Sequence, residues 1–134
     1  MIWPTPKPAL LTAIAILEEA FGEYAVVSAA LPRQNRPDRF VKVTRTGGDM
    51  RDPVTDLARL LIECYGPDIA TIEAMTGTVR AGFRNAAGTT VTAGDYQVFV
   101  RHWDNEHVVA PWPNPEILDR ERAQVTGDLA VSIN

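Results

Sequence analysis

The eleven residues that precede the C-terminal asparagine carry the most regular pattern in the 134-residue chain. Apolar or small residues stand at every second position from Ala123 to Ile133 and alternate with mostly polar residues. Successive side chains of a β-strand point to opposite faces, so a period of two predicts a strand with one buried and one solvated face. Any fold of this chain must therefore contain a sheet that is covered on one side.

Two segments carry helical spacing instead. The first runs from about residue 8 to residue 21, after an extended, proline-rich lead-in over residues 1–8, and we expect Gly22 to end it. The second follows a capping Asp68 and ends near Arg84. Its expected buried face consists of Ile69, Ile72, Met75, Val79 and Phe83.

The region between the two helices has strand-forming composition. Residues Tyr24–Leu31 and Arg39–Thr46 are β-prone and flank an exposed, proline-rich link, so a hairpin is plausible. Residues Thr55–Tyr65 predict a long central strand, although helical spacing fits them nearly as well. We expect the intervening residues Thr46–Pro53 to form a loop.

The region after the second helix predicts two more strand segments. Tyr96–Trp103 alternates as a strand does, and Asp104-Asn105 favours a turn. A short strand over Val108–Ala110 would then return. The complete order of elements predicts an α+β fold in which two helices pack on one face of an antiparallel, possibly mixed, sheet.

The size and composition fit one ordinary domain over residues 1–134. No apolar stretch is long enough to cross a bilayer and the N-terminus lacks signal-peptide features, so we expect neither a membrane partner nor secretion. Seventeen acidic and thirteen scattered basic residues give a net charge of −4, which argues against a protein that grips nucleic acid. The single cysteine, Cys64, lies in an apolar stretch and is expected to pack as a small hydrophobe.

No common catalytic or phosphate-binding motif is present, and we predict no catalytic residue, no cofactor and no metal. The nearest candidate for a metal or catalytic site is His102–His107, where two imidazoles and two carboxylates fall within six residues. An exposed hairpin end explains the same residues more simply, and the metal question stays open. The pair Gly47-Gly48 could cradle a phosphate, but a turn is the simpler interpretation.

Two segments are predicted to contact other proteins. The first is the charged loop that contains Gly47, Gly48, Asp49, Arg51 and Asp52, whose alternative is a solvated hairpin tip. The second is the proline-rich stretch that holds Trp112 and Pro113, since aromatic residues are enriched at protein interfaces. A rigid connector packed on its own domain is an equal alternative for that stretch.

The order of landmarks along nearly the whole chain resembles the tail terminator proteins of siphophages, particularly those of actinobacterial phages and prophages. The matching stretches are FVKVTRTGG at 40–48, DLARLLIECY at 56–65, WPNP at 112–115 and RAQVTGDLAV at 122–131. The resemblance implies a homohexameric ring in the virion that caps the tail tube at its head-proximal end and joins tail to head.

The partners implied by the resemblance are further copies of the chain, a tail tube protein and a head–tail connector protein, with DNA passing through without specific binding. Assembly would take place in the cytoplasm of the bacterial host. The alternatives are another neck or tail-completion protein, a monomeric binding module that uses the Trp112 segment, and an enzyme that uses the His102–His107 cluster.

Overall fold

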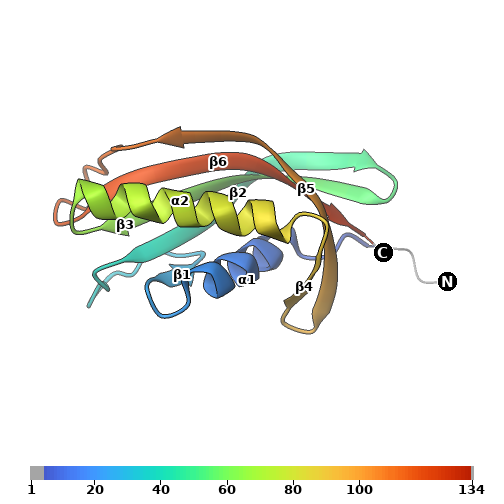
Figure 1. Ribbon diagram of the computed structural model, residues 1–134, viewed down its shortest axis with the longest axis horizontal. Helices are drawn as coiled ribbons and strands as arrows, with labels where there is room; N and C mark the ends of the chain where they lie inside the picture. The colour runs from blue at the N-terminus through green and yellow to red at the C-terminus, as the bar shows by residue number, and fades with distance from the viewer. Residues whose placement is uncertain (1–4, 134) are drawn as a thin grey trace.

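The computed structural model describes residues 5–133, which form a six-stranded sheet and two helices (Figure 1). The strands lie in the order β1-β2-β3-β6-β5-β4. In chain order the elements are α1 (Ala9–Phe21), β1 (Val26–Ser28), β2 (Phe40–Asp52), β3 (Thr55–Gly66), α2 (Ile69–Ala86), β4 (Thr90–Ala93), β5 (Tyr96–Val109) and β6 (Glu121–Ser132).

Both helices cover the same face of the sheet, which confirms the predicted fold class (Figure 1). Four of the five strand pairings are antiparallel, and the sheet is mixed because β1 pairs with β2 in parallel. The hairpin expected between these first two strands is therefore wrong. The link between them carries the chain back to the start of β2, and the Arg120 guanidinium holds it by donating to the carbonyl oxygens of Arg36 and Pro37.

The helices form where the sequence predicts them. At the start of α2 the Asp68 carboxylate accepts a hydrogen bond of 2.7 Å from the Thr71 backbone N–H, as expected of an N-cap residue. The predicted buried face is confirmed from Ile72 to Phe83, but Ile69 is 47% exposed. The buried contacts of α2 begin with Ile72, so the first turn extends past the end of the core.

Two predicted breaks are absent because strands run through them. Residues 46–52, expected to be a loop, belong to β2, and only Pro53 and Val54 separate β2 from β3. The expected turn at Asp104-Asn105 and the separate return strand are also wrong, because β5 continues to Val109. Both places are β-bulges, and Asn105 takes the positive φ of 55° that asparagine tolerates.

The core lies between the helices and the central strands β3 and β6. The predicted buried positions Val125, Leu129 and Val131 of β6 are fully buried, and so is Cys64 on β3. The opposite face of β6 is not solvated throughout as predicted, because Asp128, Ala130 and Ser132 are buried as well. This strand lies between β3 and β5, and on that face Arg59 of β3 and Asn105 of β5 donate hydrogen bonds to the Asp128 carboxylate. Burial raises the pKa of the Cys64 thiol to about 12.

A second, smaller apolar cluster lies on the other face, at one end of the sheet. Phe40 of β2 and Tyr65 of β3 are stacked with ring centroids 4.6 Å apart, and Ile117 covers them. Of the helices in the described residues, none has the length and hydrophobicity that spanning a membrane requires.

Candidate interface surfaces

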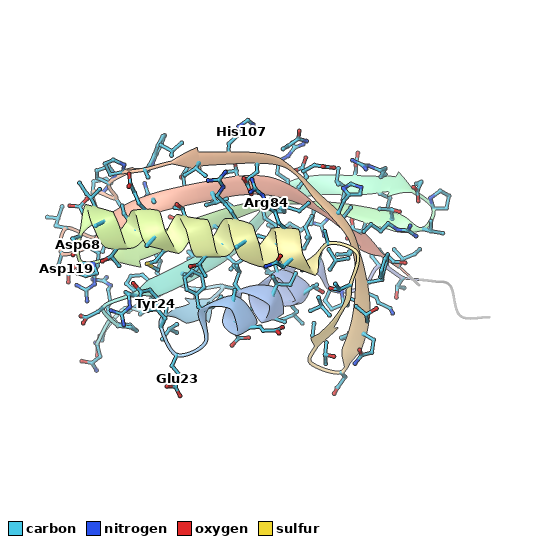
Figure 2. All side chains as sticks on the ribbon, in the orientation of Figure 1. Glu23, Tyr24, Asp68, Arg84, His107 and Asp119 are labelled. Atoms are coloured by element: carbon cyan, nitrogen blue, oxygen red, sulfur yellow. The ribbon has the colours of Figure 1, made fainter. Side chains whose placement is uncertain are left out.

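The two segments predicted to contact other proteins lie at opposite ends of the sheet. Gly47–Asp52 form the outer half of β2 and lead into the β2–β3 hairpin, while the backbone of Trp112 is bonded to Arg122 near the start of β6. The strand β3 connects the two ends from Thr55 to Tyr65, which is roughly 33 Å at the usual rise of a strand. The hairpin projects at one end of the molecule, and Asp68 and Asp119 mark the other (Figure 2).

The glycines of the first segment lie within strand β2, and Gly48 approaches the backbone of β3 closely. Gly48 has φ of +101°, and a Cβ placed there would collide with the carbonyl oxygen of Leu57 on β3. The bulge between Arg45 and Gly47 shifts the register just before this close approach. Gly47-Gly48 therefore lie inside a paired strand that leads to no helix N-terminus, which removes the loop geometry that a phosphate cradle needs.

The charges of the first segment are partly held by the chain itself. The Arg51 guanidinium lies 2.7 Å from Nε2 of His102 on β5, and Nδ1 of His102 lies 2.7 Å from the Asp104 carboxylate. The Asp52 carboxylate accepts a hydrogen bond from the Val54 backbone N–H, which lowers the pKa of Asp52. Asp49 is exposed. Of the charges in this segment, Asp49 is the one most accessible to a partner.

At the base of the same strand half, Arg45 makes a two-pronged ion pair. Its two terminal nitrogens lie 3.0 and 2.9 Å from the two carboxylate oxygens of Asp56, which is almost fully buried. A bidentate pair of this kind fixes both side chains in orientation. The outer half of β2 is thus anchored to β3 by a side-chain contact in addition to its backbone pairing.

The second segment is packed on its own domain and still presents an aromatic ring. Arg122 donates to the carbonyl oxygens of Trp112 and Pro113 and also binds the buried carboxylate of Glu63 at 2.9 Å. The Tyr65 hydroxyl donates to the same carboxylate and accepts from Asn114. Trp112 is 46% exposed, so the segment is packed on its own domain and its contact with another protein stays a prediction. A little further along, Leu118 is 89% exposed, a position that the sequence pattern did not single out.

The His102–His107 stretch is divided between the two faces of the sheet. Glu106 points to the helix side, where its carboxylate binds Arg80 and Arg84 at 2.7 Å each and accepts from the Trp103 indole at 3.0 Å. Burial opposes the ionisation of Glu106, but these donors outweigh it and lower its pKa. His107 lies at the outer edge of β5 (Figure 2). Within residues 5–133 no three His, Cys, Asp or Glu side chains are grouped so that they could hold a metal ion.

The outer side of β5 is a surface that the sequence analysis missed. The partner strand β4 pairs only with Tyr96–Phe99, and the remainder of β5 has β6 on one side alone. The sequence analysis placed a turn at Asp104-Asn105, so it did not predict one continuous strand with a long edge. The apolar residues Val98, Val100, Val108 and Val109 on both sides of that point were the available signal of one continuous strand.

Comparison with known proteins gives a structural likeness. No protein-family model matches the sequence, and no curated protein matches it. The fold is similar to that of a chain in the solved structure "Virion of native gene transfer agent (GTA) particle", with a TM-score of 0.52 and 14% sequence identity. The match covers 88% of this chain and 85% of that chain. At this identity the likeness shows a shared fold.

Proposed function

We propose that the protein is a structural component of a phage-like virion, and within it a tail terminator that forms a ring at the head-proximal end of the tail. The observation that carries the proposal is the fold shared, over most of both chains, with a chain of a gene transfer agent virion. The order of sequence stretches along the chain resembles that of siphophage tail terminators, and this resemblance points to the same class of particle.

The shape of the protomer supports a position between two other protein layers. The β2–β3 hairpin lies at one end of the sheet (Figure 1), and the Trp112 segment lies at the other, where its backbone bonds to Arg122. Leu118, which follows this segment, is exposed. A terminator ring needs two opposed contact surfaces, one for the tail tube protein and one for the head–tail connector protein. A ring of protomers with net charge −4 would also let DNA pass without binding it.

Deletion of the gene in the producing phage or prophage tests the proposal. We expect tails of irregular length and heads that are not joined to tails, seen by electron microscopy of negatively stained lysates, and rescue by the gene supplied in trans. Loss of another neck protein would leave unjoined tails of normal length, so tail length separates the two virion roles. Joined particles with normal tails in the deletion strain would contradict the proposal.

A further inference from the structure

The sheet ends on both sides in strands that are only partly paired. The short strand β1 covers Phe40–Lys42 of β2, and β4 covers Tyr96–Phe99 of β5. The rest of each strand, Val43–Asp52 of β2 and Arg101–Val109 of β5, has no strand of the described chain on its outer side. We call these stretches the β2 edge and the β5 edge. Long unpaired edges are templates for pairing with another chain, and proteins that do not use them generally cover them.

The two edges span the same rows of paired residues across the sheet, and their strands run in opposite directions. Height below means the position of a row along the strand direction, measured toward the β2–β3 hairpin. Row by row across the sheet, Thr44 pairs with Leu61, Leu61 with Thr126, and Thr126 with His107. Higher up, the row that begins at Asp49 of β2 ends at His102 of β5 in the same way. Three antiparallel steps separate the two strands, so β2 and β5 run in opposite directions. A neighbour placed beside this sheet in the same orientation would bring its β5 edge antiparallel to the β2 edge at equal height.

Each of the two strands contains two register shifts, and one shift of each strand falls in the same row of the sheet. The bulge of β2 lies between Arg45 and Gly47, whose rows reach Gly127 and Asp128 of β6. The bulge of β5 lies between Asp104 and His107, which flank the same row of Gly127. Bulges at different heights would interrupt pairing in two places. Here the two bulges at the Gly127 row face each other. The second shifts, between Met50 and Asp52 of β2 and between Val100 and His102 of β5, lie nearer the hairpin end and about one row apart. Regular stretches remain between the two irregularities and on the other side of the Gly127 row.

From this match we infer that the β2 edge of one copy pairs with the β5 edge of the next copy, so that the sheet continues from protomer to protomer. The inference rests on the proposed ring and adds its interface. Two different edges on one chain make a heterologous, head-to-tail contact, and when the rotation between copies closes, this contact forms a ring that leaves no edge free. A strand from another protein would satisfy one edge and leave the other unpaired, so the partner that fits both is a second copy of this chain.

A disulfide across the two edges can form only between copies. Within one chain Thr44 and His107 are three strand spacings apart, roughly 14 Å, whereas bridged cysteines need Cα atoms within about 7 Å. The variant Thr44→Cys with His107→Cys places both thiols in one row on the face opposite the helices. The variant Thr44→Cys with Val109→Cys accommodates a stagger of two residues along the strand.

Mild oxidation of purified protein, followed by non-reducing electrophoresis, tests the inference. We expect at least one of these double variants to give a ladder of covalent multimers that a reductant collapses to monomer. The matched control is Thr44→Cys with Val108→Cys, since a shift of one residue turns the second thiol to the other face of the sheet. The buried Cys64 is present in all variants and serves as a constant background.

The possible results separate the interface from the function. The edge pairing is overturned if neither double variant forms covalent multimers. This holds whether native mass spectrometry shows the preparation to be a ring or a monomer. Covalent dimers from Thr44→Cys alone or His107→Cys alone would also overturn it, because like edges would then be paired. The proposed function is judged independently by the deletion phenotype, which does not depend on how the protomers touch.

Discussion

The central strand β6 and the outer half of β2, residues Gly47–Asp52, belong to one sheet and are both rich in polar residues, yet their surroundings are opposite. From Gly127 onward β6 is buried on both faces, whereas the outer half of β2 is largely exposed. The strand β6 has a neighbouring strand on each side along its length, whereas the outer half of β2 pairs with β3 alone. Position in the sheet, more than polarity, therefore decides burial here.

Burial in the centre forces polar groups to find partners. The carboxylate of Asp128 on β6 is bound by Arg59 at 3.2 Å and by the Asn105 side-chain amide at 2.8 Å. On β2, exposed Asp49 needs no such partner, because water satisfies it. The comparison thus predicts large stability effects in β6 and small ones on the β2 edge, where assembly should respond instead.

The largest effect is expected from a charge on the core face of β6. Val131→Asp places a carboxylate in the apolar core, opposite Asp56, and should cost about 4 kcal/mol or more, enough to prevent folding. Thr126→Asp, on the half-buried other face, should be mild. Circular dichroism and thermal melting compare the two variants. Equal melting temperatures of the two variants would show that the two faces of β6 do not differ in burial.

A smaller loss is expected at the glycine of β6. A Cβ at Gly127 would collide with the indole ring of Trp103, which is stacked on Phe83 with centroids 4.2 Å apart. Gly127→Ala must displace that ring and should destabilise the protein by about 2 kcal/mol, the range of overpacked cores. Urea denaturation followed by tryptophan fluorescence measures it. An unchanged unfolding midpoint would mean that the ring moves aside freely.

The equivalent change on the β2 edge should act locally. Gly48→Ala forces a Cβ against the Leu57 carbonyl at a positive φ, so the outer half of β2 should separate from β3 while the core stays folded. Faster amide hydrogen exchange confined to this hairpin, with a loss of roughly 1 kcal/mol in global stability, is the expected result. Gly77→Ala on the exposed face of α2 is the control and should stabilise slightly. Uniformly faster exchange in Gly48→Ala would contradict a local effect.

A pH-dependent contribution is expected beside β6, at Glu106 of β5. Its pKa is lowered from the ordinary value of 4.5, so the ionised form stabilises the fold above that pH and the contribution is lost as pH falls through the lowered value. Glu106→Gln should therefore cost about 1 kcal/mol at pH 7, a modest value because Arg80 and Arg84 are exposed. The difference from wild type should shrink below pH 4.5 in urea titrations. A constant difference across pH would show that the charge of Glu106 is not the cause.

The smallest effect on stability is expected from reversing charges on the β2 edge. Asp49→Lys with Arg51→Glu removes the contact between Arg51 and His102 and should change the free energy of unfolding by less than about 1 kcal/mol. Because the same change recurs at every interface of a ring, we expect folded protomers that assemble poorly or yield unfinished tails. Assembly and tail joining at wild-type levels would show that these charges serve only the protomer.

The sequence predicted most of the fold because its strongest signals are local. Helical spacing placed both helices, and the period of two placed β6 and the buried positions Val125 to Val131. Two of the errors, the expected loop over residues 46–53 and the expected turn at Asp104-Asn105, share one cause. Glycine and asparagine were interpreted as turns at Gly47-Gly48 and at Asp104-Asn105, but the sheet uses both as bulges inside long strands.

The candidate interface surfaces were predictable only in part. The sequence singled out Gly47–Asp52 and the Trp112 segment, and the structure places them at opposite ends of the sheet. The sequence could not show that a short parallel β1 leaves most of the outer side of β2 unpaired, since strand order depends on contacts between distant residues. The β5 edge was missed for the same reason.

The mass of the wild-type protein in solution tests the central claim of a ring most directly. Native mass spectrometry, on the protein alone and after mixing with assembled tail tubes, should show a closed species of about six times the 14.7 kDa protomer. Its formation should be cooperative, with little dimer or trimer, because open intermediates retain free edges. If the protein stays a monomer under both conditions, even at high protein concentration, the claim of a ring is contradicted.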